Sequence, residues 1–208
     1  QFIDVAVGLQ YLHQNDFVHG NLKGANILVD SNLRARLADF SRARIIDDQA
    51  LENQTKPPTG LERDDRIREI GDSIRWSAPE IIDPDRFGFT KNNFPKLPSK
   101  STDMYALAMT ILEVLTGEPP FGKSSDGSVA KKVLAKVRPE KPHAGFSGGL
   151  WDLLQLSWSE EYEHLESKRP PISLILTQLQ KDSSSWFSAP RLAFPSIDSK
   201  RSSLSFSE

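Results

Sequence analysis

Side chains suited to holding a metal ion gather in the segment from residue 17 to residue 39, FVHGNLKGANILVDSNLRARLAD. Asp39 offers a hard anionic oxygen and Asn26 a neutral amide oxygen, and both suit a Mg²⁺ ion that keeps part of its water shell. Asn21 carries an amide that can hydrogen-bond a hydroxyl group but cannot take its proton at neutral pH. We therefore expect a metal site at Asn26 and Asp39, with a nearby Asn21 that can hydrogen-bond a hydroxyl group without acting as a base.

The residues between Asn26 and Asp39 predict the element that brings the two side chains together. Residues 25–29 are predicted to form a short buried strand, residues 30–32 a turn, and residues 33–38 a half-exposed return strand of alternating character. Such a hairpin carries Asn26 on one strand and Asp39 after the other. The two side chains are therefore expected to lie face to face.

A longer series extends this pattern: His19, Leu22, Lys23, Asn26, Asp39, Phe40, Ala78, Pro79 and Glu80. In order and spacing it resembles the protein kinase superfamily, whose motifs are His-Arg-Asp-Leu-x-x-x-x-Asn, Asp-Phe-Gly and Ala-Pro-Glu. Three positions depart from these motifs, since Gly20 replaces the arginine, Asn21 the first aspartate and Ser41 the glycine. These three departures fall on positions that take part in the chemistry, and not on the scaffold.

The resemblance implies a role for each matching residue. Asn21 and Lys23 take the catalytic positions, with Lys23 beside the transferred phosphate, and Lys23, Asn26 and Asp39 take the cofactor positions. Asn26 and Asp39 are the implied metal ligands. The implied cofactors are ATP and Mg²⁺ if the full protein carries an amino-terminal lobe, and otherwise none. Because general-base assistance is worth about 10²–10⁴-fold in rate, Asn21 predicts strong impairment.

The other two departures bear on regulation. In the family, the arginine that Gly20 replaces pairs with a phosphorylated activation loop, so this route to switching is expected to be absent. Ser41 tolerates fewer backbone conformations than glycine and is expected to restrict the movement of Asp39. Thr55, Thr59 and Ser73 are candidate phosphorylation sites in the long polar segment between Phe40 and Ala78.

Apolar residues at helical spacing predict helices over residues 1–14, 101–117, 129–137, 150–158 and 171–180. With the hairpin they predict a mainly α fold, a helical bundle that resembles the carboxy-terminal lobe of the α+β protein kinase fold. Resemblance further implies that Asp103 anchors the backbone of the catalytic loop. It also implies a buried ion pair between Glu80 and Arg169.

Domain organisation follows from motif order and composition. Residues 1–181 are predicted to be one kinase-like domain consisting of the carboxy-terminal lobe, with the amino-terminal lobe expected to be absent because no Gly-x-Gly-x-x-Gly loop occurs. Residues 182–208 are rich in serine and are predicted to be a disordered tail.

Charge and composition narrow the partners. The chain has 208 residues, a formal net charge of −2 and no cysteine, which gives no electrostatic footprint for nucleic acid or an anionic membrane and excludes disulfides. No apolar run is long enough to span a membrane. A cytoplasmic protein is expected, with a protein substrate or signalling partner, and with neither nucleic acid nor a membrane.

Three alternatives remain open from the residues, and they leave open whether the chain is an enzyme. The first is a fragment of a serine/threonine or tyrosine-kinase-like protein kinase domain, with ATP-dependent transfer to protein hydroxyls strongly impaired. The second is a pseudokinase, a binding or scaffolding module without catalysis. The third is a non-functional truncated gene product. A Gly-rich loop and a strand lysine upstream of Gln1 would favour the first two.

Overall fold

The computed structural model describes residues 1–46, 70–88, 98–142, 146–160, 162–163 and 166–186. Its α-helices are α1 Phe2–Gln14, α3 Pro79–Ile82, α4 Lys100–Thr116, α5 Asp126–Leu134, α6 Gly148–Ser157 and α7 Ile172–Trp186. Short 3-10 helices are η1 Gly24–Asn26, η3 Gly71–Trp76 and η4 Pro84–Phe87. Strands are β1 Phe17–Val18, β2 Ile27–Val29, β3 Ala35–Leu37, β4 Arg44–Ile45, β5 Tyr162–Glu163 and β6 Glu166–Ser167. The predicted mainly α fold is confirmed.

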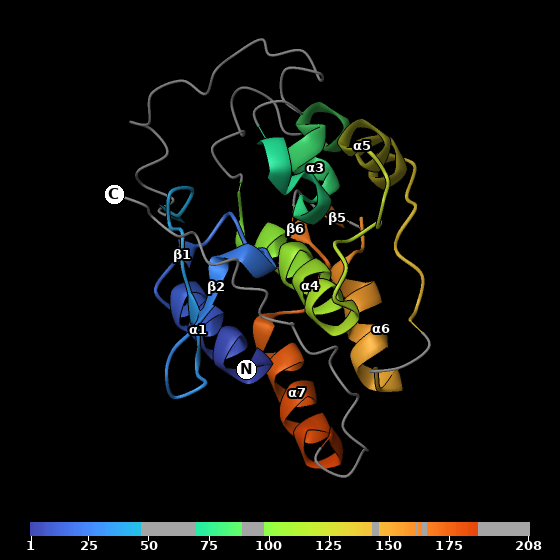
Figure 1. Cartoon of the computed structure of the whole chain (residues 1–208). Coiled ribbons are helices and arrows are strands. Elements are labelled where there is room, and N and C mark those ends of the chain that lie inside the picture. The colour runs from blue at the N-terminus through green and yellow to red at the C-terminus, as the bar shows by residue number, and fades with distance from the viewer. Residues whose placement is uncertain (47–69, 89–97, 143–145, 161, 164–165, 187–208) are drawn as a thin grey trace, which may run out of the picture.

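Helix α4 lies at the centre of the molecule, with α1 on one side and α6 on the other (Figure 1). Every residue from 102 to 112 is buried. The helix begins earlier than predicted because its cap is Ser99, which forms a capping box with Thr102. It ends at Gly117, whose φ of 71° is the left-handed conformation that glycine adopts without strain. The central helix is thus fixed at both ends by its own sequence.

The remaining helices pack around α4 and complete the core. Helix α6 contacts both α4 and α7, while α7 also lies against α1. The stripe predicted on α6 is confirmed, since Trp151, Leu154 and Trp158 are all buried. The rings of Trp151 and Trp158 meet edge to face with centroids 5.6 Å apart, an arrangement favoured by the aromatic quadrupole. These side chains are core rather than ligand-binding.

Helices α5 and α7 differ from their predicted ranges by three residues or more at one or both ends. Helix α5 begins at Asp126 instead of residue 129, because Ser125 supplies the extended residue before its first turn. Helix α7 continues to Trp186, six residues past its predicted end. Asp182 explains the continuation: it is buried and accepts hydrogen bonds from Ser147 and Gln178, at 2.6 and 2.9 Å. Residues 187–208 of the predicted tail lie outside the described residues.

The strands form two-stranded antiparallel sheets: β1 pairs with β4, β2 with β3, and β5 with β6. The predicted hairpin is confirmed, with Ile27 opposite Leu37 and Val29 opposite Ala35. Its first strand was predicted to be buried, which is wrong, since Leu28 is 59% exposed. The reason is that β2 pairs with β3 alone in the described ranges, and no described layer covers its outer face.

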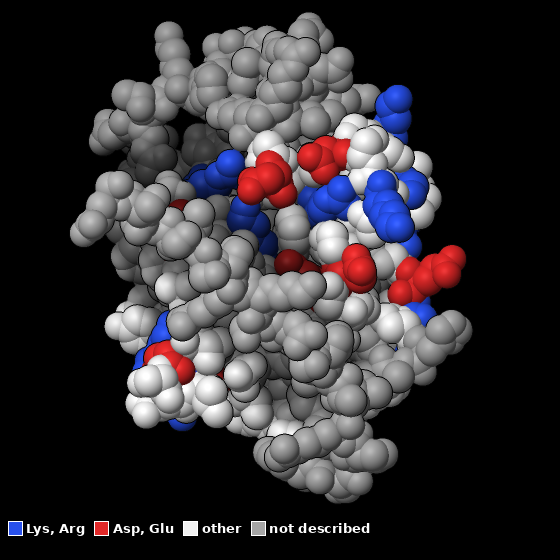
Figure 2. All heavy atoms as spheres, viewed as in Figure 1, with Lys and Arg blue, Asp and Glu red and all other residues white. Residues whose placement is uncertain are grey.

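The surface carries both signs of charge. Figure 2 shows lysine, arginine, aspartate and glutamate side chains interspersed on one face, in keeping with the small net charge. Within the ranges that the structure describes, none of the helices is both long enough and apolar enough to span a bilayer.

Candidate active site

The loop after β1 is fastened to the central helix through Asp103. One carboxylate oxygen of Asp103 accepts the backbone N–H of His19 at 2.8 Å, and the other accepts that of Gly20 at 2.9 Å. The ring Nε2 of His13, from α1, lies 3.0 Å from the same carboxylate. Asp103 is 1% exposed, so these bonds are shielded from water. The predicted anchoring role of Asp103 is confirmed.

His19 is held as a neutral imidazole that braces the loop. Its Nδ1 accepts the backbone N–H of Asn21 at 3.3 Å, so Nε2 carries the proton and donates to the carbonyl of Ala38 at 3.0 Å. Burial keeps the pKa of His19 below its ordinary value, against the opposing effect of the Asp103 carboxylate. The ring also lies 5.1 Å from that of Phe40. His19 therefore joins the loop to the segment that carries Asp39.

The structure explains why glycine occupies position 20, which the motif comparison did not reveal. The φ of Gly20 is +75°, a conformation that side chains rarely adopt. A Cβ atom there would lie 2.6 Å from the carbonyl oxygen of Arg42 and 3.1 Å from Cγ of Pro98. This backbone path leaves no room for the arginine that the family motif places at the position.

Replacing Gly20 with alanine is expected to lower the free energy of unfolding by about 1–3 kcal/mol, because the backbone carbonyl of Arg42 must move. Urea denaturation of the chain measures the change. Gly127 in α5 is the matched control, since nothing lies within 4 Å of its added Cβ. Gly127→Ala is expected to be neutral or stabilising by about 0.5–1 kcal/mol. Equal losses for the two variants would contradict the strained path at Gly20.

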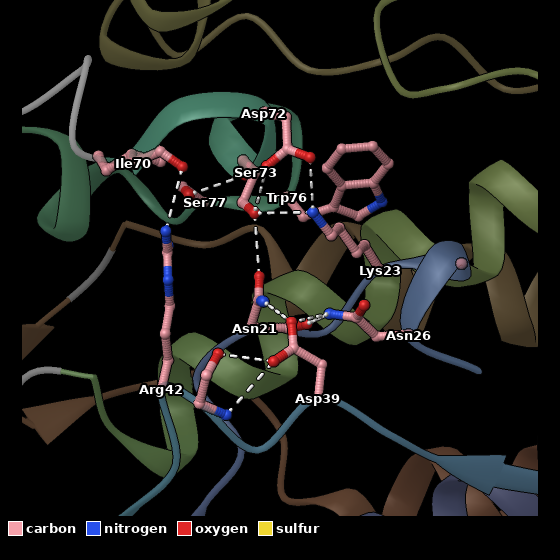
Figure 3. A network of polar contacts seen from close by, with 12 residues as sticks. Asn21, Lys23, Asn26, Asp39, Arg42, Ile70, Asp72, Ser73, Trp76 and Ser77 are labelled. Atoms are coloured by element: carbon pink, nitrogen blue, oxygen red, sulfur yellow. Dashed lines mark hydrogen bonds and ion pairs between the residues drawn. The ribbon is translucent and has the colours of Figure 1, made fainter. Parts of the chain in front are cut away.

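Three of the predicted site residues meet at one carboxylate (Figure 3). The side-chain Nδ2 of Asn21 donates to Oδ2 of Asp39 at 2.7 Å, and that of Asn26 lies 3.3 Å from the same oxygen. Asn26 also donates to the backbone carbonyl of Asn21 at 2.7 Å. The hairpin thus brings Asn26 and Asp39 together as predicted.

Ser41 occupies the second oxygen of Asp39. Its hydroxyl donates to Oδ1 at 2.6 Å, and its backbone N–H lies 3.3 Å from the same atom. These bonds from Ser41, together with that from Asn21, hold the pKa of Asp39 below its ordinary value. Asp39 is therefore an anion whose two oxygens are both engaged by protein donors.

The other end of the Asn21 amide and the side chain of Lys23 both contact η3. The hydroxyl of Ser73 donates to Oδ1 of Asn21 at 2.9 Å. The Lys23 ammonium lies 3.0 Å from a carboxylate oxygen of Asp72 and 3.2 Å from the Ser73 hydroxyl. The Lys23 bond also lowers the pKa of Asp72. Lys23 is therefore neutralised by a neighbouring acid.

Asp72 and Ser73 were not predicted as site residues. Ser73 was a candidate phosphorylation site, which is wrong for this arrangement because it is 6% exposed and its hydroxyl is hydrogen-bonded inside the site. The other two candidates, Thr55 and Thr59, lie outside the described residues. No local signal pointed to these contacts, since Asp72 is 49 residues from Lys23 along the chain.

Glu113 is a further residue that sequence reasoning missed. From α4, one oxygen of its carboxylate accepts the backbone N–H of Gly24 at 2.8 Å and the indole N–H of Trp76 at 2.9 Å. A Cβ on Gly24 would lie 2.8 Å from this carboxylate, which explains the glycine. Glu113 therefore joins the loop to η3. An acid among the mostly apolar residues that follow Asp103 in α4 was the signal that could have revealed it.

The predicted buried ion pair between Glu80 and Arg169 is confirmed. The guanidinium of Arg169 donates to both oxygens of Glu80, at 2.6 and 2.9 Å. Their side chains are 0% and 1% exposed. Arg169 also donates to the carbonyl oxygens of Ser101 and Ser159. The pair ties α3, which follows η3, to the start of α4.

The residues fit a magnesium ion poorly. Asp39 and Asn26 lie together, but both Asp39 oxygens accept protein hydrogen bonds and the two nearby amides point N–H groups at it. A divalent cation needs oxygen lone pairs on that side. Among the described residues, no group of three or more histidine, aspartate or glutamate side chains is placed to hold a metal.

A hollow of about 360 Å³ lies beside this site rather than within it. Its lining comes from α1 and β3, with Phe40 at one edge. Neither Asn21 nor Lys23 lines it. The hollow is therefore separate from the hydrogen-bond network around Asp39.

Comparison with known proteins agrees with the motif order. A family model described as protein tyrosine and serine/threonine kinase matches residues 1–179. The chain is 32% identical over 180 residues to the serine/threonine-protein kinase STY46 of Arabidopsis thaliana, a match covering 86% of this chain and 26% of that protein. It is 35% identical over 170 residues to the mitogen-activated protein kinase kinase kinase 1b of Physcomitrium patens, covering 82% and 18%.

A tyrosine kinase is also similar. The chain is 28% identical over 180 residues to the tyrosine-protein kinase Btk of Drosophila melanogaster, covering 85% of this chain and 19% of that protein. The chain therefore spans about a quarter or less of the length of these curated relatives.

Proposed function

The chain belongs to the protein tyrosine and serine/threonine kinase family, and from this premise we propose that it is a kinase domain whose phosphoryl transfer is strongly impaired. The proposed type is serine/threonine or tyrosine-kinase-like, with ATP as the phosphate donor and a protein hydroxyl as the acceptor. The described helices and the hairpin support assignment to the carboxy-terminal lobe. In this proposal the scaffold is kept and the chemistry is altered.

The observation that carries the proposal is the position of Asn21. Its N–H donates to Asp39 and its carbonyl accepts from Ser73, so the amide is bonded at both ends. Phosphoryl transfer to a hydroxyl needs a group that orients the hydroxyl and accepts its proton. An amide can orient the hydroxyl but has no basic atom at neutral pH. The expected deficit is about 10²–10⁴-fold in rate.

Lys23 supports the same conclusion. A lysine in the family position acts as a point charge for the transferred phosphate. Here its ammonium is paired with the carboxylate of Asp72, a side chain that is 86% exposed. A phosphate would have to compete with that carboxylate for Lys23. The contact therefore weakens phosphate binding beyond the loss of the base.

A second candidate is a pseudokinase that binds a protein partner without catalysis. It is favoured by the contrast between scaffold and site. Asp103 and the Glu80–Arg169 pair keep their complete sets of bonds, although the base position holds an amide. A module that acts by binding a partner needs Asp103 and the Glu80–Arg169 pair to keep its fold, but it needs no catalytic base.

The variant Asn21→Asp tests the proposed function. Restoring a carboxylate at the base position is expected to raise phosphoryl transfer by about tenfold or more. The measurement is transfer of labelled phosphate from ATP, with Mg²⁺ in the buffer, to peptides bearing serine, threonine or tyrosine. It is made with the full protein that carries this chain. Gln155→Glu adds the same charge on an exposed face of α6 and is the control.

Two results would count against the proposal. A parent protein that turns over at about 1–100 s⁻¹, the usual range of kinases, would show that Asn21 does not impair transfer. No gain in Asn21→Asp over the control would place the defect elsewhere and favour the pseudokinase.

A further inference from the structure

Asp39 is exposed, yet both of its carboxylate oxygens accept hydrogen bonds from donors at two of the substituted motif positions. Asn21 donates to one oxygen at 2.7 Å and the hydroxyl of Ser41 donates to the other at 2.6 Å. Asn26 lies 3.3 Å from the first oxygen. In the family motif these two positions hold an aspartate, which has no N–H group, and a glycine, which has no side chain. The family motif therefore could not form these two side-chain bonds to Asp39, and this chain forms both.

The exchange at Asn21 also changes the charge of the site. An aspartate there would place a second carboxylate against Asp39, and two like charges so close repel unless a cation lies between them. The amide of Asn21 carries no charge and presents a hydrogen-bond donor instead. The site therefore carries one carboxylate charge instead of two. No repulsion between carboxylates remains for a cation to relieve.

A cation would also have to displace existing bonds. Hydrogen bonds to an ionised carboxylate are stronger than those between neutral groups, and the bonds from Asn21 and Ser41 are short. Ser41 reaches Asp39 from only two residues away, so its bond needs little ordering of the chain. The N–H groups of Asn21 and Asn26 both point at Oδ2 of Asp39, where a cation would need oxygen lone pairs instead.

From these contacts we propose that the Asp39 carboxylate is satisfied by Asn21 and Ser41 in place of a divalent cation. The chain itself therefore binds no such cation at Asp39. The inference rests on the family assignment, which marks this site as the metal position. It does not depend on how fast phosphate is transferred. It also gives Ser41 a function, because its hydroxyl satisfies the carboxylate oxygen that a metal would otherwise take.

The test uses Mn²⁺ alone, without nucleotide, and the whole 208-residue chain. Binding is followed by loss of the electron paramagnetic resonance signal of free Mn²⁺. The parent is expected to show no saturable site tighter than about 1 mM, the weak end of oxygen-ligand cation sites. The double variant Asn21→Asp with Ser41→Gly is expected to bind Mn²⁺ about tenfold more tightly, since it restores the charge and removes the competing hydroxyl.

Two controls locate the effect. Gln155→Glu adds a carboxylate on an exposed helix face and is expected to leave Mn²⁺ binding unchanged. Adding Asp39→Asn to the double variant is expected to abolish the gained site. Circular dichroism establishes that each variant keeps the helical content of the parent.

The inference is overturned if the parent binds Mn²⁺ well below 1 mM and Asp39→Asn removes that binding. It is also overturned if the folded double variant binds no better than Gln155→Glu. The first of these outcomes needs only the parent and the single variant Asp39→Asn, so a double variant that fails to fold leaves the inference open to refutation. A fast parent kinase would overturn the proposed function and leave this nucleotide-free measurement standing.

Discussion

Replacing Glu80 with alanine is expected to lower the free energy of unfolding by about 3–5 kcal/mol. The change leaves the Arg169 guanidinium, which is fully buried, without the carboxylate that accepts two of its N–H groups. Removing one partner of a buried ion pair is far more costly than losing a surface ion pair. The bonds of Arg169 to the carbonyls of Ser101 and Ser159 and to the Ser101 hydroxyl involve neutral acceptors, which do not replace the carboxylate charge. Urea denaturation of the chain gives the difference in unfolding free energy.

An exposed ion pair provides the control for this measurement. Asp16 contacts Lys100 at 2.6 Å, with side chains 63% and 40% exposed. Asp16→Asn is expected to cost about 0–1 kcal/mol, since exposed pairs contribute little. The double replacement Glu80→Leu with Arg169→Met removes both charges and is expected to cost less than Glu80→Ala. A loss below about 1 kcal/mol for Glu80→Ala would contradict the buried pair.

Replacing Asp103 with alanine is expected to cost about 3 kcal/mol or more, because the buried donors of His13 and His19 and the half-buried N–H of Gly20 lose their acceptor at once. Each unsatisfied buried donor costs about 1–3 kcal/mol. The damage is expected to be greatest at the loop, so hydrogen exchange at the amides of His19 and Gly20 should speed up by more than about tenfold. Urea denaturation and hydrogen exchange together separate the global loss from the local one.

The control for Asp103 is an acid that makes no such contact. Asp152 is exposed on α6, and Asp152→Ala is expected to leave both the unfolding free energy and the exchange rates unchanged. If Asp103→Ala lowers stability but leaves the His19 and Gly20 amides protected, the anchoring role is refuted.

Motif spacing and periodicity predicted much of what the structure contains. The hairpin followed from alternation, and it placed Asn26 beside Asp39. The bonds of Asp103 and the Glu80–Arg169 pair were implied by family resemblance, and both are present. The roles of Asn21, Lys23, Asn26 and Asp39 in binding ATP and Mg²⁺ stay predictions.

The features that the sequence did not predict depend on tertiary contacts or on helix caps. Asp72 and Ser73 contact Lys23 and Asn21 because the chain returns to the site about fifty residues later, and no local pattern encodes that return. The exposure of β2 depends on which elements lie over it. Helix ends also shifted where caps outweighed periodicity, as Ser99 shows for α4.

The sequence by itself determined the family, the mainly α fold and the presence of an amide where a base is expected, because motifs and periodicity are properties of residues along one chain. Only the tertiary structure decided what that amide does. Folding places Asp39 and Ser73 at the two ends of Asn21, and it places Ser41 on the second oxygen of Asp39. Such contacts depend on the direction and distance of side chains in space, and these are fixed only when the segments pack together.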